Sequence, residues 1–305
     1  MDRLHTMQVF VAVADAGNFA RAGAKLNLSP PAVTRAVSSL EERLGVRLFN
    51  RTTRSLSLTE AGEDYLSECR RLLEDIEGVE QIVRGRAATA SGHLRVTAPV
   101  TFGRKCTTPL LSDFLDVHPQ ITATLLCLDR VVDIVEEGID IAVRIAHLPD
   151  STLLARRVGH VRQVLVASPD YLDMAPKLET PGDLESHRTI TTTALAHAGN
   201  WRLVLDGKPC TAAIRPRLDV NDAAAVITEA ERGGGLVMAL SYMVEDAVRA
   251  GRLKLVLDRF MPDPVPVSLV YPPTRKVSGK VRAFVDFAAP RLAERLGEME
   301  LAREV

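Results

Sequence analysis

Residues 29–45, SPPAVTRAVSSLEERLG, are predicted to form a short amphipathic helix, and the sequence indicates its start, its end and its buried face. Serine caps helix starts and proline is tolerated in the first helical turn, so the helix is predicted to begin at Ser29 and Pro30. Gly45 is predicted to end it. Four apolar residues at spacings of 4, 3 and 4 fall on one stripe: Val33, Val37, Leu40 and Leu44.

The opposite face of this helix is short and polar, with a single cation among small side chains. Such a face suits close approach to base edges in the major groove of DNA. It carries Pro31, Thr34, Arg35, Ser38 and Glu42.

Two further helices are predicted upstream. Asn18 is positioned to cap a helix over 19–26, and Asn27-Leu28 forms the turn into the next helix. A helix–turn–helix pair with a polar second helix is a DNA-binding pattern. A first helix, which completes a small core, is predicted from apolar residues at spacings of 3, 4 and 3: Leu4, Met7, Val11 and Ala14.

The stretch LFNRTTRSLSLT, residues 48–59, predicts a hairpin, or wing, with cations at its tip. Arg51 and Arg54 have no acidic neighbour in sequence and are therefore expected to contact phosphate. The DNA-contacting set predicted from helix and wing is Pro30, Pro31, Thr34, Arg35, Ser38, Arg51, Thr53 and Arg54.

The charge distribution agrees with a DNA-binding head. Residues 1–58 carry a net charge of +4, residues 59–90 of −4, and the whole chain of −1. A compact basic segment on a neutral body indicates that only this segment meets a polyanion.

The segment FARAGAKLNLSPPAVTRAVSSLEERLGVRLFNRTTRSLSLTEAG resembles the winged helix-turn-helix of LysR-type transcriptional regulators. The shared pattern is S-x-P-A-x-S-R, then L-E-x-x-L-G-x-x-L-F-x-R, then L-T-x-A-G. Pro30 and Thr34 stand where glutamine and serine are frequent in the family, which affects the expected base preference. The resemblance implies dimers that pair into tetramers, and a two-lobed, periplasmic-binding-protein-like effector domain with hinge motion.

Residues 59–88 are predicted to form one long helix with an unbroken heptad seam, which favours a partner helix. Packing of this helix on its own head, or on the following domain, remains an alternative. The predicted dimer seam is Tyr65, Cys69, Leu72, Ile76, Val79 and Val83.

Residues 89–305 alternate between strand and helix patterns, which predicts α/β lobes built on parallel sheets. The patterns include strands at 93–99, 121–128 and 140–145, helices at 101–119 and 129–139, and a hairpin over 201–218. The expected fold class is α/β overall, with a mostly α winged helix-turn-helix head. The expected domains are a head at 1–58, a linker helix at 59–88 and an effector domain at 89–305. The resemblance further implies that the last strand and helix return to the first lobe, so that lobe I is about 92–161 and 267–300 and lobe II about 162–266.

A small-molecule site is expected where strands end and helices begin, because helix amino termini present unpaired N–H groups. Arg144 adds a cation at a strand end, so an anionic effector, a carboxylate, is predicted. Arg144 pairing with Asp129 or Asp140, and plain helix capping by threonine and asparagine, remain alternatives. The predicted effector residues are Thr101, Phe102, Asp129, Arg144 and Asn221.

The sequence offers no pattern for catalysis, a metal or a cofactor. Gly233-Gly234-Gly235 precedes a strand, so it is no phosphate-binding loop, and no histidine has metal-ligand spacing. Four separated cysteines favour reduced, buried thiols, with a redox sensor as an alternative. No apolar run is long enough to span a bilayer, so a cytoplasmic protein without a membrane partner is expected.

The expected function is DNA-binding transcriptional regulation, with duplex DNA, a small effector and the chain itself as partners. Two rival functions stay open: a solute-binding protein whose head only oligomerises, and an architectural DNA-binding protein. Salt-sensitive DNA binding separates the first rival from a regulator. The second leaves two-thirds of the chain without a role.

Overall fold

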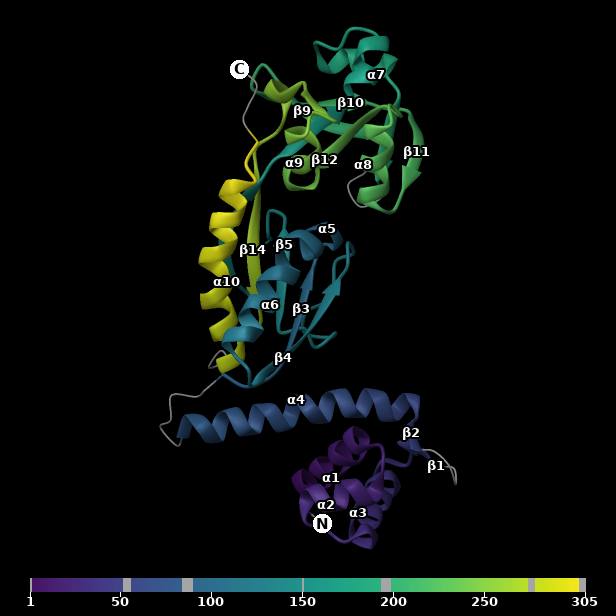
Figure 1. The fold of residues 1–305 in the computed structure, drawn as a ribbon, viewed down its shortest axis with the longest axis vertical. Coiled ribbons are helices and arrows are strands. Elements are labelled where there is room, and N and C mark those ends of the chain that lie inside the picture. The colour runs from purple at the N-terminus through teal and green to yellow at the C-terminus, as the bar shows by residue number, and fades with distance from the viewer. Residues whose placement is uncertain are drawn as a thin grey trace. The chain divides into compact units, whose positions relative to one another are not determined.

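The computed structural model describes residues 2–51, 56–83, 90–149, 151–192, 199–273 and 278–301. The chain forms two compact units, Met1–Thr89 and Ala90–Val305 (Figure 1).

The amino-terminal unit begins with the predicted three-helix head. Its helices are α1 (Arg3–Ala16), α2 (Phe19–Leu26) and α3 (Pro30–Leu44). The apolar stripe of α3 is buried at Val33, Val37 and Leu40 and packs against α1 through Val9 and Phe10. Leu44, the fourth residue of the predicted stripe, is instead 39% exposed. The predicted helix-turn-helix is therefore confirmed.

The helix ends follow the predicted signals with one exception. The Asn18 side chain accepts hydrogen bonds from the amides of Ala20 and Arg21 and so caps α2. Asn27 (φ 55°) and Gly45 (φ 72°) take left-handed conformations that end α2 and α3. Ser29 is the N-cap residue of α3, but its side chain makes no capping hydrogen bond. The expected cap is absent there because Pro31 has no N–H to donate and the amide of Ala32 donates to the Ser29 carbonyl (2.9 Å) instead.

The predicted wing is present as β1 (Phe49–Arg51) paired antiparallel with β2 (Leu56–Leu58). The carboxylate of Glu41, on α3, accepts hydrogen bonds from the amides of Leu48 (2.9 Å) and Phe49 (3.1 Å). This carboxylate fixes the start of the wing to the helix that carries the polar face. Thr53 and Arg54, at the predicted tip, lie outside the described residues.

Helix α4 (Glu60–Val83) follows the wing and accounts for most of the predicted linker helix. Residues 84–88 of that prediction lie outside the described residues. The first turns of α4 pack on the head, where Leu66 and Cys69 are buried in its core.

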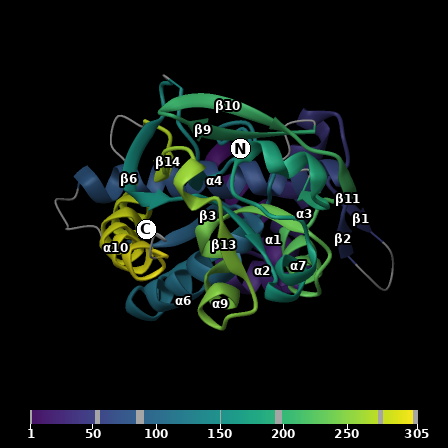
Figure 2. The ribbon, with the colours of Figure 1, turned by 90° about the horizontal axis from the view of Figure 1, so that it is seen from above.

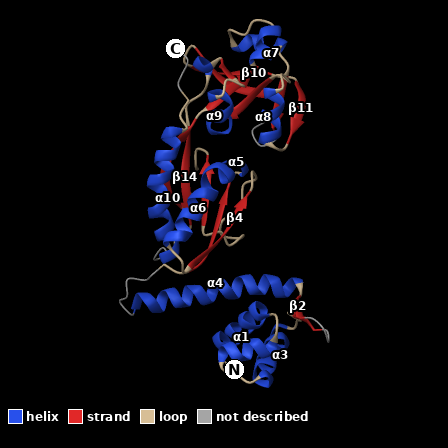
Figure 3. Cartoon of the chain, viewed as in Figure 1, coloured by secondary structure: helices blue, strands red, loops and turns tan. Residues whose placement is uncertain are grey.

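The second unit contains two mixed sheets flanked by helices (Figure 3). The sheet of lobe I has the order β4-β3-β5-β14-β6, in which β3 pairs parallel with β4 and β5 while β14 pairs antiparallel with β5 and β6. The continuous helical stretch formed by α5, η1 and α6 covers one face of this sheet together with α10. The elements of lobe I are β3 (Gly92–Ala98), α5 (Val100–Phe102), η1 (Gly103–Thr107), α6 (Thr108–Val117), β4 (Ile121–Cys127), β5 (Ile141–Ile145), β6 (Leu154–Val161), β14 (Val265–Tyr271) and α10 (Gly279–Glu298).

The sheet of lobe II has the order β11-β8-β12-β7-β13. Strand β7 shows how alternation builds two cores: Val164 and Val166 face α8 and α9, whereas Leu165 and Ala167 face the β9–β10 hairpin. The two strands of that hairpin run side by side in both views (Figures 1 and 2). The elements of lobe II are β7 (Gln163–Ala167), α7 (Pro169–Met174), η2 (Pro181–Ser186), β8 (Thr189–Thr192), β9 (Asn200–Leu205), β10 (Lys208–Ala213), β11 (Pro216–Val220), α8 (Ala223–Glu231), β12 (Leu236–Leu240), α9 (Ser241–Arg249), β13 (Lys254–Val256) and η3 (Asp258–Phe260).

The sequence pattern predicts parallel sheets, and this prediction is only partly correct. In each lobe a parallel core is extended by antiparallel strands. Strands β6 and β13 were not predicted, because β6 is largely polar (LARRVGHV) and β13 has only three residues.

The predicted helix over 129–139 is wrong, since these residues form turns. The Asp133 carboxylate accepts from the amides of Val135 and Glu136 and closes a single turn, and Gly138 (φ 61°) then reverses the chain. Ile134 and Ile139 are buried against the second face of the lobe I sheet. Burial at this five-residue spacing outweighs the helical pattern that the sequence suggested.

The Glu41 contact to the wing can be tested by mutation. Glu41→Ala leaves two backbone amides without their carboxylate partner and is expected to destabilise the head by about 2 kcal/mol. Glu42→Ala is the matched control, because Glu42 is the neighbouring, exposed glutamate and its loss is expected to change stability by less than about 0.5 kcal/mol. Urea unfolding followed by circular dichroism measures both. Equal effects of the two substitutions would contradict the anchoring role.

Candidate DNA-binding and effector sites

The head presents the predicted polar surface on α3. Pro30, Pro31, Thr34, Arg35 and Ser38 are all exposed, while the opposite face of α3 is buried. The Thr34 hydroxyl donates to the carbonyl of Pro30 (3.0 Å), which leaves its oxygen free to accept. Five of the eight predicted DNA-contacting residues therefore share one open face. Of the rest, Arg51 ends β1, and Thr53 and Arg54 lie outside the described residues.

The predicted dimer seam on α4 divides into two parts. Tyr65 packs on the ring of Phe10, with ring centroids 5.4 Å apart, and Cys69 is buried in the head core. Leu72 and Ile76 instead expose about two-fifths of their surface, at 40% and 39%. The start of the seam thus packs on the head, whereas Leu72 and Ile76 are exposed to solvent. Val79 and Val83 lie on α4, and nothing further is described of their side chains.

Three of the predicted effector residues meet at one helix terminus. Elements α5, η1 and α6 run on as one helix from Val100 to Val117. Asp129, which follows β4, accepts a hydrogen bond from the amide of Val100 (2.9 Å) and caps this helix. Thr101 and Phe102, in the same turn, are buried. The turn therefore combines a buried hydroxyl, helix N–H groups and one exposed carboxylate.

The middle of this helix is a π-helical turn, Gly103–Thr107. Pro109 has no N–H to donate to the carbonyl of Lys105, which accounts for the wider turn. Gly103 is required because a β-carbon there would lie 2.4 Å from the sulfur of Cys127. Backbone and glycine together bring the helix close to β4.

Tyr242 is a residue of this region that sequence reasoning missed. It lies in the first turn of α9, its ring packs edge-on against Phe102 with centroids 5.3 Å apart, and it is fully buried. Burial, and then the charge of Asp129, raises the pKa of its hydroxyl. The signal was available, because Tyr242 follows a strand in the same way as Thr101 does.

Arg144 and Asn221 lie apart from that turn in their contacts. Arg144 donates to the carbonyl of Val132 (2.5 Å), and burial lowers the pKa of its guanidinium. Asp140 instead pairs with Lys280 (3.2 Å). Asn221 is exposed, and the cap of α8 is Asp222. Among the described residues, no hydrogen bond or ion pair joins Arg144 or Asn221 to Thr101, Phe102 or Asp129.

A cavity of about 240 Å³ lies elsewhere, where the chain crosses between the lobes. It is lined by the end of β6, the start of α9 and the last turn of α10, with Arg162, Ser241 and Leu296 among its walls. Arg162 is already bound to Asp258 (2.8 Å) and to the carbonyl of Leu301 (2.8 Å). The residues that line the cavity do not include any of the predicted effector residues, so the cavity is separate from them.

The cysteines are free, and Cys69 and Cys106 are buried. Burial raises the pKa of the Cys106 thiol to about 11, so the reactive thiolate is disfavoured near neutral pH. Over the described ranges, no group of histidine, cysteine and acidic residues is placed to hold a metal ion. Nor does any helix in those ranges have the length and apolarity to cross a bilayer.

Comparison with known proteins agrees with this architecture. Residues 4–63 match the family model of the bacterial regulatory helix-turn-helix proteins of the lysR family, and residues 87–293 match the LysR substrate binding domain. An HTH-type transcriptional repressor of Pseudomonas aeruginosa is 36% identical over 296 residues, which cover 96% of this chain and 93% of that protein.

Two solved structures are similar over nearly the whole chain. CrgA of Neisseria meningitidis, a LysR-type transcriptional regulator, shares 31% identity and a TM-score of 0.60, covering 97% of this chain and 100% of its own. The Vibrio cholerae virulence activator AphB shares 27% identity and a TM-score of 0.60, covering 94% and 98%.

Both parts of the chain match models of one family, and full-length relatives have the same order of parts. The chain belongs to the LysR-type family of DNA-binding transcriptional regulators and carries a substrate-binding domain.

Proposed function

We propose that this regulator is not an enzyme and that its sequence-specific DNA binding is modulated by a small anionic metabolite. The observation that carries the DNA-binding part is the exposed polar face of α3, with Arg35 at its centre. The proposal locates the protein in the cytoplasm, where it has access to duplex DNA.

We propose that two heads act together through α4. Leu72 and Ile76 are large apolar side chains left open on a helix whose earlier seam residues are buried in the head. A second copy of α4 would cover them, and two heads on one symmetric dimer read two half-sites. Pairing of dimers into tetramers through the effector domains is the further assembly that we propose.

We propose that the effector binds at the amino end of the Val100–Val117 helix. The Thr101 hydroxyl and the N–H groups of that turn favour an anion such as a carboxylate. The negative charge of Asp129 opposes an anion at this position. Its carboxylate also accepts the hydrogen bond of one of these N–H groups, that of Val100. Asn221, in lobe II, is assigned to the effector as a residue that would approach it when the lobes move. Arg144, on β5 of the same lobe I sheet, is assigned as the cation for the anionic effector.

DNA binding is tested with Arg35→Ala and Arg54→Ala in the full-length protein. Each is expected to weaken binding to operator DNA by about five- to 100-fold, because a cation that meets bases or phosphate is lost. Arg104→Ala, an exposed arginine of the effector domain, controls for the change in net charge. Fluorescence anisotropy at several salt concentrations measures affinity and its salt dependence. An affinity for operator DNA that is unchanged by both head substitutions would contradict the assignment of this face to DNA binding.

Dimerisation is tested with the double variant Leu72→Glu and Ile76→Glu. Two carboxylates on the apolar seam are expected to shift the protein towards monomers, because a buried charge without a partner is costly. Ser67→Glu adds a carboxylate to an exposed site on the same helix and is expected to leave the dimer intact. Sedimentation velocity distinguishes the two. A double variant that stays dimeric would show that α4 is not the interface.

Effector binding is tested by thermal shift with a panel of small carboxylic acids, amines and sugars. At least one acid is expected to raise the melting temperature, and Thr101→Val is expected to weaken that binding about tenfold through loss of a charge-assisted hydrogen bond. Glu185→Gln, an exposed site in lobe II, is the control. Stabilisation by amines or sugars but by no acid would refute the anionic assignment.

A further inference from the structure

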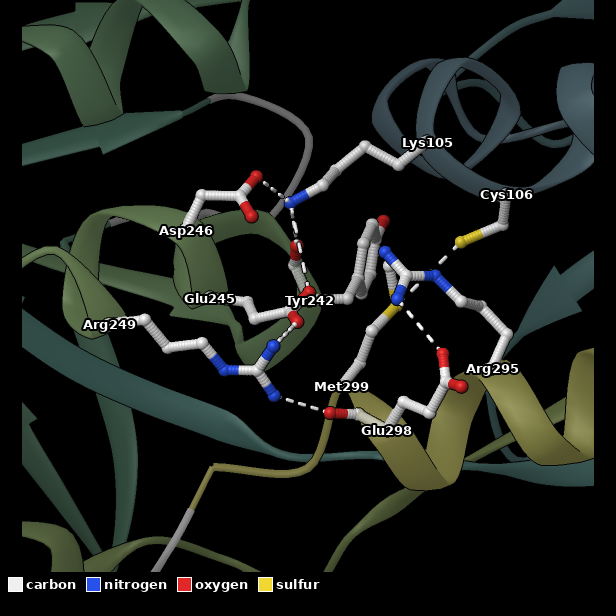
Figure 4. A network of polar contacts seen from close by, with 9 residues as sticks. All are labelled: Lys105, Cys106, Tyr242, Glu245, Asp246, Arg249, Arg295, Glu298 and Met299. Atoms are coloured by element: carbon white, nitrogen blue, oxygen red, sulfur yellow. Dashed lines mark hydrogen bonds and ion pairs between the residues drawn. The ribbon is translucent and has the colours of Figure 1, made fainter.

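At a polar junction between the two lobes, a hydrogen-bond donor and a hydrogen-bond acceptor lie near each other without forming a hydrogen bond. It joins the π-helical turn of lobe I to α9 of lobe II and to the end of α10 (Figure 4). Lys105 reaches across from the π turn, and its side chain is 16% exposed. The junction is thus made of long side chains whose partners lie on the other lobe.

Lys105 uses two of its three donors. Its ammonium group donates to the carbonyl of Tyr242 (2.9 Å) and to the carboxylate of Asp246 (2.8 Å), both on α9. The Asp246 side chain is 71% exposed, so water competes for this ion pair. One N–H of the ammonium group remains for a further acceptor.

One carboxylate oxygen of Glu245, next to Asp246, lacks a hydrogen bond among the described residues. Its side chain is 1% exposed, and Arg249 binds its Oε1 at 2.5 Å. Its Oε2 makes no hydrogen bond to any described residue and lies 4.0 Å from the Lys105 Nζ atom. Buried carboxylate oxygens are rarely left in that condition, because the loss of water is uncompensated.

A second buried polar group at the same junction also lacks a partner. The Tyr242 hydroxyl forms no hydrogen bond with the described residues, although its ring is packed on Phe102 of lobe I. Both unsatisfied atoms belong to α9 and lie against lobe I. Four other buried side-chain atoms in the described ranges also lack a hydrogen bond, on Thr107, His187, Thr189 and Ser278. Glu245 Oε2 differs because an unused Lys105 donor lies 4.0 Å from it on the other lobe, so the relative position of the lobes decides whether the two form a hydrogen bond.

We propose that Lys105 is a latch with a second, closed position, in which the lobes approach by about 1 Å at α9 and Nζ donates to Glu245 Oε2. The bond to the exposed Asp246 holds the open position that is described here. Arg249, which also donates to the carbonyl of Glu298 at the end of α10, keeps α9 attached in both positions. The effector domain is therefore built with two lobe arrangements that differ in one lysine contact.

The latch predicts a closing shift that depends on both Lys105 and Glu245. Asp246→Asn weakens the open contact and is expected to shift the lobes towards closure. Lys105→Met removes both contacts, so in the double variant Asp246→Asn/Lys105→Met the closing shift is expected to be lost. In the double variant Asp246→Asn/Glu245→Gln the closing shift is expected to be lost, because the closed acceptor has lost its charge. Arg104→Met, the exposed cation beside Lys105, is the matched control and is expected to match the wild type.

Pulsed electron spin resonance on the full-length protein measures these shifts. Nitroxides are attached to unnatural amino acids at the exposed positions Asp116 in lobe I and Asp173 in lobe II, so that the native cysteines stay unlabelled. Labelled chains are diluted with unlabelled chains to isolate the distance within one chain. A closing shift for Asp246→Asn that is lost in both double variants, with no shift for Arg104→Met, supports the latch.

A closing shift that persists in either double variant, or no shift for the exposed Asp246→Asn, overturns it. Circular dichroism melts establish that each variant is folded, and Asp246→Asn still decides the question if the Lys105→Met double variant unfolds. The measurement needs neither DNA nor effector, so its outcome is independent of the proposed function.

Discussion

The arrangement of the effector domain depends on a buried ion pair where the chain passes between lobes. Arg162 lies between β6 of lobe I and β7 of lobe II, and Asp258 lies on the return path between β13 and β14. Their side chains are each 5% exposed and bind at 2.8 Å. Loss of either partner would leave a buried charge unpaired, at a cost of about 3–5 kcal/mol. The pair ties both crossings together and so fixes the region where the two lobes join.

The long helix α4 illustrates how one apolar seam can serve two neighbours. A seam of constant heptad spacing carries no mark that divides head packing from dimer contact. The division comes from the head itself, because Phe10 and the surrounding core reach only as far as Cys69. The apolar surface beyond that point, at Leu72 and Ile76, is the part that the proposed dimer would cover.

Sequence patterns predicted the head well, because its signals are local: Asn18, Gly45 and the stripe of α3 each act within a few residues. They failed at 129–139, where contacts of Ile134 and Ile139 with a distant sheet outweigh local helix preference. The candidate effector turn was located from its strand-to-helix position. Tyr242 occupies the same kind of strand-to-helix position, but its contact with Phe102 could not be predicted, because the two residues are far apart in sequence and no spacing rule links them.

The π-helical turn at Gly103–Thr107 has a consequence for how insertions and deletions can be tolerated. A π turn holds about one residue more than an α-helical turn, which rotates everything after it by about 100° relative to what precedes it. Thr101 and Lys105 lie on a stretch that contains this offset, so their relative orientation is set by residue count as well as by side-chain identity. Shortening the stretch by one residue would turn the helix terminus away from the lysine while each side chain remained chemically intact.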